Sequence, residues 1–144
     1  DRGSDERQYC SPGIDLPVVT LSRSKFGTYP EYHTSLDNLD LVTDKGLLGG
    51  YIFVQDCIKA VENNHYYETN VICEPHFAKY GLYKSATKGV SPDIRKMLNL
   101  VAYSNAQNDL LWIAEKINCN INELLPIVEQ LVKNNILKKI SIYK

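Results

Sequence analysis

The chain has 144 residues, of which 44% are hydrophobic and 23% are charged, and its formal net charge is -1. These values are typical of globular domains and exclude a strongly basic protein whose overall charge would attract nucleic acid. No stretch reaches the roughly 18 apolar residues of a membrane helix and no charged-then-apolar leader is seen. We therefore predict a cytoplasmic protein of one or two small domains, without membrane contact.

The first 21 residues divide into a polar opening and an apolar stretch. The run GSDER at residues 3–7 is dense in charge beside a glycine, which is typical either of a frayed terminus or of a polar loop at a site. A short helical turn is expected over residues 6–10, ended by Pro12-Gly13. Residues 16–21, LPVVTL, are rich in β-branched side chains and bounded by turn residues, and this pattern predicts a buried strand.

The next segment carries a histidine on a polar loop. Residues 22–30 predict a loop, and the sequence YPEYHTSLDNLDLV at 29–42 places His33 at its end. A histidine in a polar loop is usually a hydrogen-bonded surface residue, but the aromatic, hydroxyl and acidic neighbours of His33 make it a ligand candidate. Three acidic or amide side chains that follow are expected to cap the next helix, namely Asp37, Asn38 and Asp40.

A long amphipathic helix is predicted over residues 41–63. Its apolar residues recur at helical intervals, at Leu47, Leu48, Tyr51, Ile52, Ile58 and Val61. Gly49 and Gly50 inside it lower helix propensity by roughly 1 kcal/mol each. Glycines in such positions predict that another backbone approaches the helix closely.

Residues 65–90 are rich in tyrosine and glycine and are predicted to be a connecting segment over a larger surface, with a strand at 69–73. Cys73 and His76 form a C-x-x-H pair with His65 upstream. A zinc site needs about four ligands, so we favour structural roles for these three. The four cysteines of the chain form no CxxC pair and are expected to be reduced, mostly buried thiols.

Three short helices are predicted in the last third of the chain. Ser91-Pro92 marks a helix start, with a serine cap and a proline at the first helical position, and the helix is expected over residues 92–104. A turn at 105–108 leads to a second helix at 109–117. A third helix follows the turn at 118–120 and has a wide apolar face.

A small strand is expected in the alternating tail that follows residue 136. Three short helices and a strand in this order resemble a winged helix-turn-helix domain. We expect this domain to fold around a core contributed by all three helices, at Leu98, Ile113, Leu124, Val128 and Leu131.

The third helix decides between two functions for such a domain. A helix-turn-helix commonly places one helix in the major groove of DNA. Here that helix offers Glu123 and Glu129 against Lys133, where phosphate contact requires lysine or arginine. We favour packing or protein interaction, with Trp112 as the candidate anchor. DNA binding by a winged-helix regulator remains the alternative, through the lysines at 133, 138, 139 and 144.

Two polar motifs carry a resemblance to a known family. GSDERQYCSPG at residues 3–13 and YPEYHTSLDNLD at 29–40 resemble the last part of the catalytic domain of the co-catalytic zinc exopeptidases, which include aminopeptidases, glutamate carboxypeptidase and glutaminyl cyclase. With the winged helix that follows, they are most similar to a bacterial aminopeptidase-like branch that is linked to polysaccharide biosynthesis.

The resemblance implies roles for individual residues. His33 matches the last metal-ligand histidine, and Ser4 and Asp5 match a loop that lines the substrate pocket. Arg7 and Tyr32 are implied to contact substrate. The family's other ligands and its general base do not occur upstream in this chain, and one histidine does not hold a catalytic zinc. Zinc and a peptide or amide substrate are therefore expected only in a complete protein.

The sequence thus predicts two parts. Residues 1–90 are expected to be an α/β fragment of an aminopeptidase-like three-layer fold plus a connecting segment, and residues 91–144 a mainly α winged helix-turn-helix domain. We predict a C-terminal fragment of a zinc-dependent aminopeptidase-like hydrolase that is not catalytically complete alone. Its expected partners are the remainder of the peptidase-like domain and a second copy of the chain.

Overall fold

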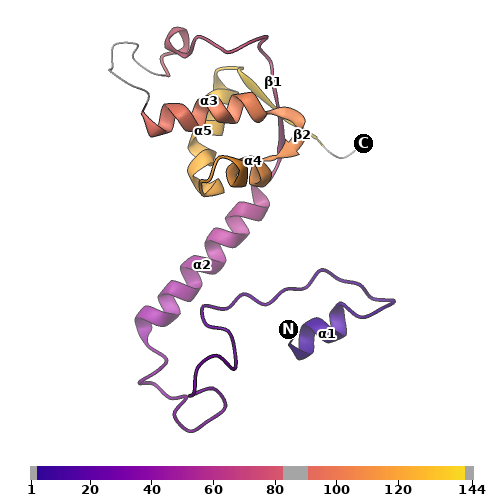
Figure 1. The fold of residues 1–144 in the computed structure, drawn as a ribbon, viewed down its shortest axis with the longest axis vertical. Helices are drawn as coiled ribbons and strands as arrows, with labels where there is room; N and C mark the ends of the chain where they lie inside the picture. The colour runs from indigo at the N-terminus through magenta and orange to yellow at the C-terminus, as the bar shows by residue number, and fades with distance from the viewer. Residues whose placement is uncertain (1–2, 83–90, 142–144) are drawn as a thin grey trace. The chain divides into compact units, whose positions relative to one another are not determined.

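The computed structural model describes residues 3–82 and 91–141 (Figure 1). The chain forms two compact units, Asp1–Gln55 and Asp56–Lys144. The elements follow in the order α1 (Ser4–Tyr9), α2 (Asp44–Glu62), β1 (Tyr66–Thr69), the 3-10 helix η1 (Phe77–Tyr80), α3 (Pro92–Tyr103), β2 (Asn105–Asp109), α4 (Leu110–Lys116), α5 (Ile121–Lys133) and β3 (Leu137–Ile140).

The second unit is built on a small antiparallel sheet with the strand order β2-β1-β3. In the register between β1 and β3, Tyr66 faces Ile140 and Thr69 faces Leu137. Figure 1 shows α3, α4 and α5 gathered beside this sheet. This arrangement of helices and sheet is consistent with the predicted winged helix.

Each of the three helices begins at a side chain that accepts a backbone hydrogen bond. The Ser91 hydroxyl accepts from the Ile94 amide, and the Asp109 carboxylate accepts from the Trp112 amide at 2.8 Å. Asn120 and Glu123 form a reciprocal capping box at the start of α5. Such caps pair amides that would otherwise lack a partner, at about 1 kcal/mol each. The predicted helix starts at Ser91 and Asp109 are confirmed.

The core of the second unit joins the helices to the sheet. Ile113, Leu124, Val128 and Leu131 are buried as predicted, and Leu98 is half-buried against them. Further buried side chains come from segments before and after the three helices, among them Tyr67, Phe77, Ile136 and Leu137. Because burying one large apolar side chain contributes roughly 1.5–3 kcal/mol, this core accounts for the compactness of the unit.

Two predictions in this unit were wrong in detail. Residues 105–108, expected as a turn, belong to the strand β2, whose polar sequence NAQND lacks an apolar alternation. Its pairing with β1 is irregular and Ala106 has φ 62°, features typical of a bulge at a sheet edge. The strand expected at 69–73 instead ends at Thr69 and starts earlier, so the connecting segment supplies the central strand and the buried Phe77.

The first unit has no buried residue among those described. Each described residue from Gly3 to Gln55 is exposed or half-buried, and Val19 and Leu39 are 71% and 86% exposed. The buried strand expected at residues 16–21 does not form. A strand requires a neighbour to pair its amides and carbonyls, and the described part of this unit contains no other strand.

The helix predicted at residues 41–63 is present as α2. It is capped by Thr43, whose hydroxyl accepts from the Gly46 amide at 3.1 Å. The expected caps Asp37, Asn38 and Asp40 lie before the helix; the Asn38 side chain accepts instead from the amide of Asp40. None of the helices in the described part of the chain combines the length and apolar character that a bilayer crossing demands.

The predicted boundary between residues 90 and 91 borders the segment 83–90, which lies outside the described residues. The cytoplasmic location stays a prediction.

Candidate functional site

His33 lies on an exposed loop, as predicted. The loop, residues 24–43, is called the His33 loop below, and it is made of short local turns. His33 is exposed and has φ 61°, in the left-handed region that few residues other than glycine adopt. Its ring nitrogens have no hydrogen-bond partner within the described residues, so they remain available to a ligand.

A row of aromatic rings leads to His33. The Tyr32 ring stacks on the imidazole with a centroid distance of 4.1 Å and an interplanar angle of 23°. Tyr29 meets Tyr32 edge-on at 5.8 Å, and Phe26 lies 6.2 Å from Tyr32. Because one face of the imidazole is covered, the ring has a defined plane.

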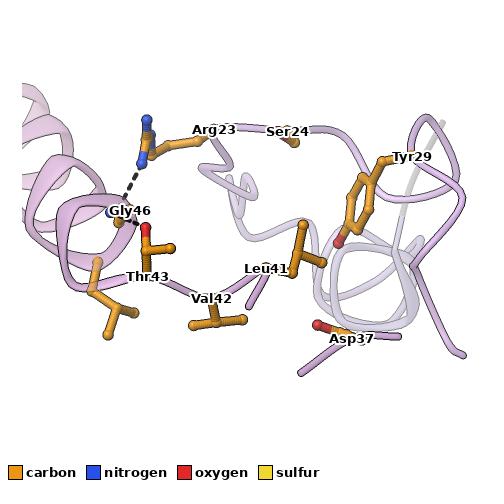
Figure 2. A pocket seen from close by; sticks show the side chains of 9 residues that line it. Arg23, Ser24, Tyr29, Asp37, Leu41, Val42, Thr43 and Gly46 are labelled. Carbon is orange, nitrogen blue, oxygen red and sulfur yellow. Dashed lines mark hydrogen bonds between the residues drawn. The ribbon is translucent and has the colours of Figure 1, made fainter. Parts of the chain in front are cut away.

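A hollow of about 330 Å³ lies beside this row (Figure 2). Its lining includes Arg23, Tyr29 and Asp37, together with apolar side chains of Leu41, Val42 and Leu47. In Figure 2 the Arg23 side chain reaches α2 at Gly46, while Tyr29 and Asp37 stand at the other end. Arg23 Nη1 donates to the Gly46 carbonyl at 2.7 Å.

The glycines of α2 make room for Arg23. Gly46, Gly49 and Gly50 are spaced i, i+3, i+4 and so share one face of the helix. A Cβ atom added at Gly49 would lie 3.2 Å from Arg23 Cζ and Nη1. The close approach predicted from these glycines is therefore made by a side chain rather than by another backbone.

Three of the other predicted site residues lie on α1. Ser4, Asp5 and Arg7 are exposed there, and no described hydrogen bond, ion pair or ring contact joins them to Tyr32 or His33. Of the predicted site residues, the described contacts bring only Tyr32 and His33 together. The substrate roles of Ser4, Asp5, Arg7 and Tyr32 stay predictions.

Glu6, which sequence reasoning did not single out, ties α1 to the following segment. The Thr20 hydroxyl donates to its carboxylate, and this hydrogen bond holds the pKa of Glu6 below its ordinary value. Glu6 also lines a second hollow, of about 480 Å³, whose lining includes Phe26. Since Phe26 approaches Tyr32, this hollow connects α1 to the aromatic row.

The described residues do not provide a complete set of zinc ligands. Among the described residues, no three histidine, cysteine, aspartate or glutamate side chains are grouped closely enough to hold a metal ion. Cys73 and His76 lie in the second unit and are exposed, and burial lowers the pKa of half-buried His65. The role of His33 as a zinc ligand stays a prediction.

In the second unit, the acidic start of α5 is occupied by internal contacts. Glu123 accepts from the Asn120 amide at 3.1 Å and from Lys96 Nζ at 2.5 Å, which joins α5 to α3. This pair lowers the pKa of Glu123 and raises that of Lys96. On the wing, Lys138 pairs with Glu68 at 2.8 Å.

Comparison with known families divides the chain near residue 64. Residues 64–139 match the winged helix-turn-helix family. Residues 1–64 match a domain of unknown function, DUF4910.

Two similar proteins come from Clostridium acetobutylicum. One, named for polysaccharide biosynthesis and an aminopeptidase-like domain, is 37% identical over 139 residues, which are 94% of this chain and 32% of that protein. The other is a crystal structure named as a peptidase, which is 35% identical and has a TM-score of 0.80. The match covers 96% of this chain and 30% of the chain in that crystal structure. The chain thus spans about a third of the length of each.

Proposed function

The chain belongs to the winged helix-turn-helix family, and from that premise we propose that it is the C-terminal part of a zinc-dependent aminopeptidase-like hydrolase, whose winged helix serves packing or protein interaction. The first unit supplies part of the α/β hydrolase domain and His33. The substrate is a peptide or amide, and this chain alone does not complete the catalytic site.

One observation carries this proposal: the first unit exposes an apolar surface that no described residue covers. Its described side chains include no buried one, although its part of α2 bears large apolar residues such as Leu47, Leu48 and Tyr51, each more than half exposed. Exposed apolar patches of this extent mark surfaces that pack against something else. The similar proteins, about three times longer, are named aminopeptidase-like and peptidase, which supports a hydrolase domain as the covering part.

The geometry of His33 supports its role as a zinc ligand. Its left-handed backbone costs about 1 kcal/mol or more, and such strain is concentrated at functional sites. Its stacked ring presents free nitrogens in a defined plane. A bound zinc would polarise the scissile carbonyl or lower the pKa of a water molecule. Tyr32, with Ser4, Asp5 and Arg7 on α1, would contact the substrate.

The alternative, a DNA-binding regulator, is less well supported. The N-terminal residues of a recognition helix are the ones that reach base edges. In α5 these positions include Glu123, which is engaged by Lys96 and by its own helix cap. On the wing, Lys138 is paired with Glu68, which reduces the charge available to phosphate.

The test is zinc binding by the longer protein that contains this chain. His33→Ala is expected to weaken zinc affinity by at least about 100-fold, more than the loss of an outer-shell partner. His76→Ala, which removes an exposed histidine of the second unit, is the matched control and should leave affinity unchanged. Equal zinc affinity in the wild type and both variants, measured by competition with a chelating dye, would refute the proposal.

A further inference from the structure

We propose that Arg23 is a positioning residue for His33: by holding the start of the His33 loop against the glycine face of α2, it fixes the turn that presents the imidazole. This inference rests on the proposed role of His33 as a ligand. It assigns a function to Arg23, which neither the sequence motifs nor the comparisons single out, and it gives a reason for the glycines on the facing side of α2.

Several hydrogen bonds inside the His33 loop are local. Thr28, Tyr32, Thr34, Asp37 and Val42 each donate to carbonyls at most four positions earlier. Such bonds build turns but do not fix the loop on the helix. The bond from Arg23 to Gly46 spans 23 positions and joins the two ends of the loop.

The fit between Arg23 and α2 is close at one glycine and loose at its neighbour. A Cβ at Gly49 would meet Arg23 Cζ and Nη1 at 3.2 Å, which is tighter than most real contacts. A Cβ at Gly50 would meet only Arg23 Cδ, at 3.9 Å, an ordinary van der Waals distance. A methyl group at position 49 would therefore require the guanidinium to shift by a few tenths of an ångström, whereas a methyl group at position 50 would not.

The path from Arg23 to His33 is short. Arg23 and Tyr29 line the same hollow, as Figure 2 shows. Tyr29 contacts Tyr32 edge-on, and Tyr32 stacks on His33. When the Arg23 end of the loop is released, the aromatic row that orients the imidazole loses its fixed start.

The experiment uses the longer protein that contains this chain, with the variants Arg23→Ala and Gly49→Ala. Both should speed hydrogen exchange of the amides of residues 29–37 about tenfold, the effect of losing one hydrogen bond to a charged group. Both should also weaken zinc affinity about tenfold, as loss of an orienting partner does. Gly50→Ala is the matched control and should change neither quantity.

Alanine favours a helix over glycine, so a loss in Gly49→Ala does not come from melting of α2. If Gly49→Ala acts by displacing Arg23, the double variant Arg23→Ala/Gly49→Ala should show the same hydrogen exchange and the same zinc affinity as Arg23→Ala alone. Arg23→Lys, which retains a donor for the Gly46 carbonyl, should recover part of the zinc affinity.

The outcomes separate this inference from the proposed function. If exchange in Arg23→Ala and Gly49→Ala equals that of Gly50→Ala, Arg23 does not fix the loop and the inference is overturned. A second outcome is that Arg23→Ala and Gly49→Ala speed hydrogen exchange but bind zinc as tightly as the wild type, while His33→Ala binds it more weakly. Arg23 then has a structural role only, and the inference is again overturned. If His33→Ala itself leaves zinc affinity unchanged, the proposed function fails, and the exchange rates still decide whether Arg23 fixes the loop.

Discussion

At the scale of the residue, Glu123 combines two tasks that usually fall to separate side chains. One carboxylate oxygen completes the cap of α5 by accepting from the Asn120 amide, and the other accepts from Lys96 on α3. A single acidic side chain therefore both begins one helix and joins it to another. Because Glu123 is exposed and Lys96 only half-buried, water and salt screen the attraction between the charges.

The Lys96–Glu123 pair predicts a pH dependence. The pKa of Glu123 is lowered, so its contribution to stability is present above its ordinary value of 4.5 and is lost as pH falls through the lowered value. The pKa of Lys96 is raised, so its contribution is present below 10.5 and is lost as pH rises through the raised value. Glu123→Gln should be slightly less stable than wild type at pH 7, and the difference should shrink as pH falls toward 3.

Urea unfolding of the chain at the two pH values, followed by the fluorescence of its single tryptophan, Trp112, measures this difference. Glu129→Gln is the control, because Glu129 lies on the same helix and has no ion-pair partner in the part of the chain that the structure describes. A stability gap between wild type and Glu123→Gln of the same size at both pH values would contradict the assignment.

At the scale of the element, the helices of the second unit and the strand β3 were predictable, whereas the bounds of β1 and the existence of β2 were not. The starts of α3 and α4 are indicated by local sequence signals, namely a serine before a proline and an aspartate before an apolar repeat. The polar strand β2 exists only because β1, far away in the sequence, pairs with it. Residues 16–21 show the converse, since their composition suits a strand but the described residues of the unit offer no neighbour.

The candidate site was predictable to a similar extent. The exposed loop position of His33 followed from polar and turn-forming neighbours. Its contact with Tyr32 was not derivable, because ring stacking depends on backbone angles that include a left-handed histidine. Arg23 was missed, although the i, i+3, i+4 spacing of Gly46, Gly49 and Gly50 was a visible sign that something lies on that helix face.

Buried and exposed side chains of α5 should differ in how much stability is lost when each is truncated to alanine. Leu124 is fully buried, whereas Val132 on the same helix is 41% exposed. Leu124→Ala should reduce the free energy of unfolding by about 2–5 kcal/mol, since it removes buried methyl groups and leaves a cavity. Val132→Ala, the matched control, should cost less than about 1 kcal/mol. Urea titration followed by Trp112 fluorescence would disprove this packing if the two variants were equally stable.

At the scale of the whole molecule, charge decides between the two uses of the winged helix. The net charge of -1 provides no overall attraction to a polyanion. Local attraction would have to come from lysines near the wing, of which Lys138 is paired with Glu68 and Lys144 lies outside the described residues.

We therefore expect weak binding of random-sequence duplex DNA, with a dissociation constant above about 1 μM at physiological salt. Fluorescence anisotropy with a labelled duplex, at two salt concentrations, measures this. Tight binding with a steep salt dependence that disappears when Lys133, Lys138 and Lys139 are reversed to glutamate would show that the wing binds DNA. The matched control reverses Lys45 and Lys59 on α2.

The strand order β2-β1-β3 also has a consequence for synthesis on the ribosome. β1, the middle strand, is made first, and neither of its neighbours exists when it emerges. The helices α3, α4 and α5 can each coil as they appear, because their hydrogen bonds are local. The sheet is complete only after Ile140 has left the exit tunnel, so until then the core that contains Tyr67 and Phe77 lacks Leu137. Folding of this unit is therefore complete only after β3 has been made, and a ribosome that stalls before Leu137 holds a chain in which one edge of β1 lacks its partner strand, the kind of edge on which nascent chains aggregate.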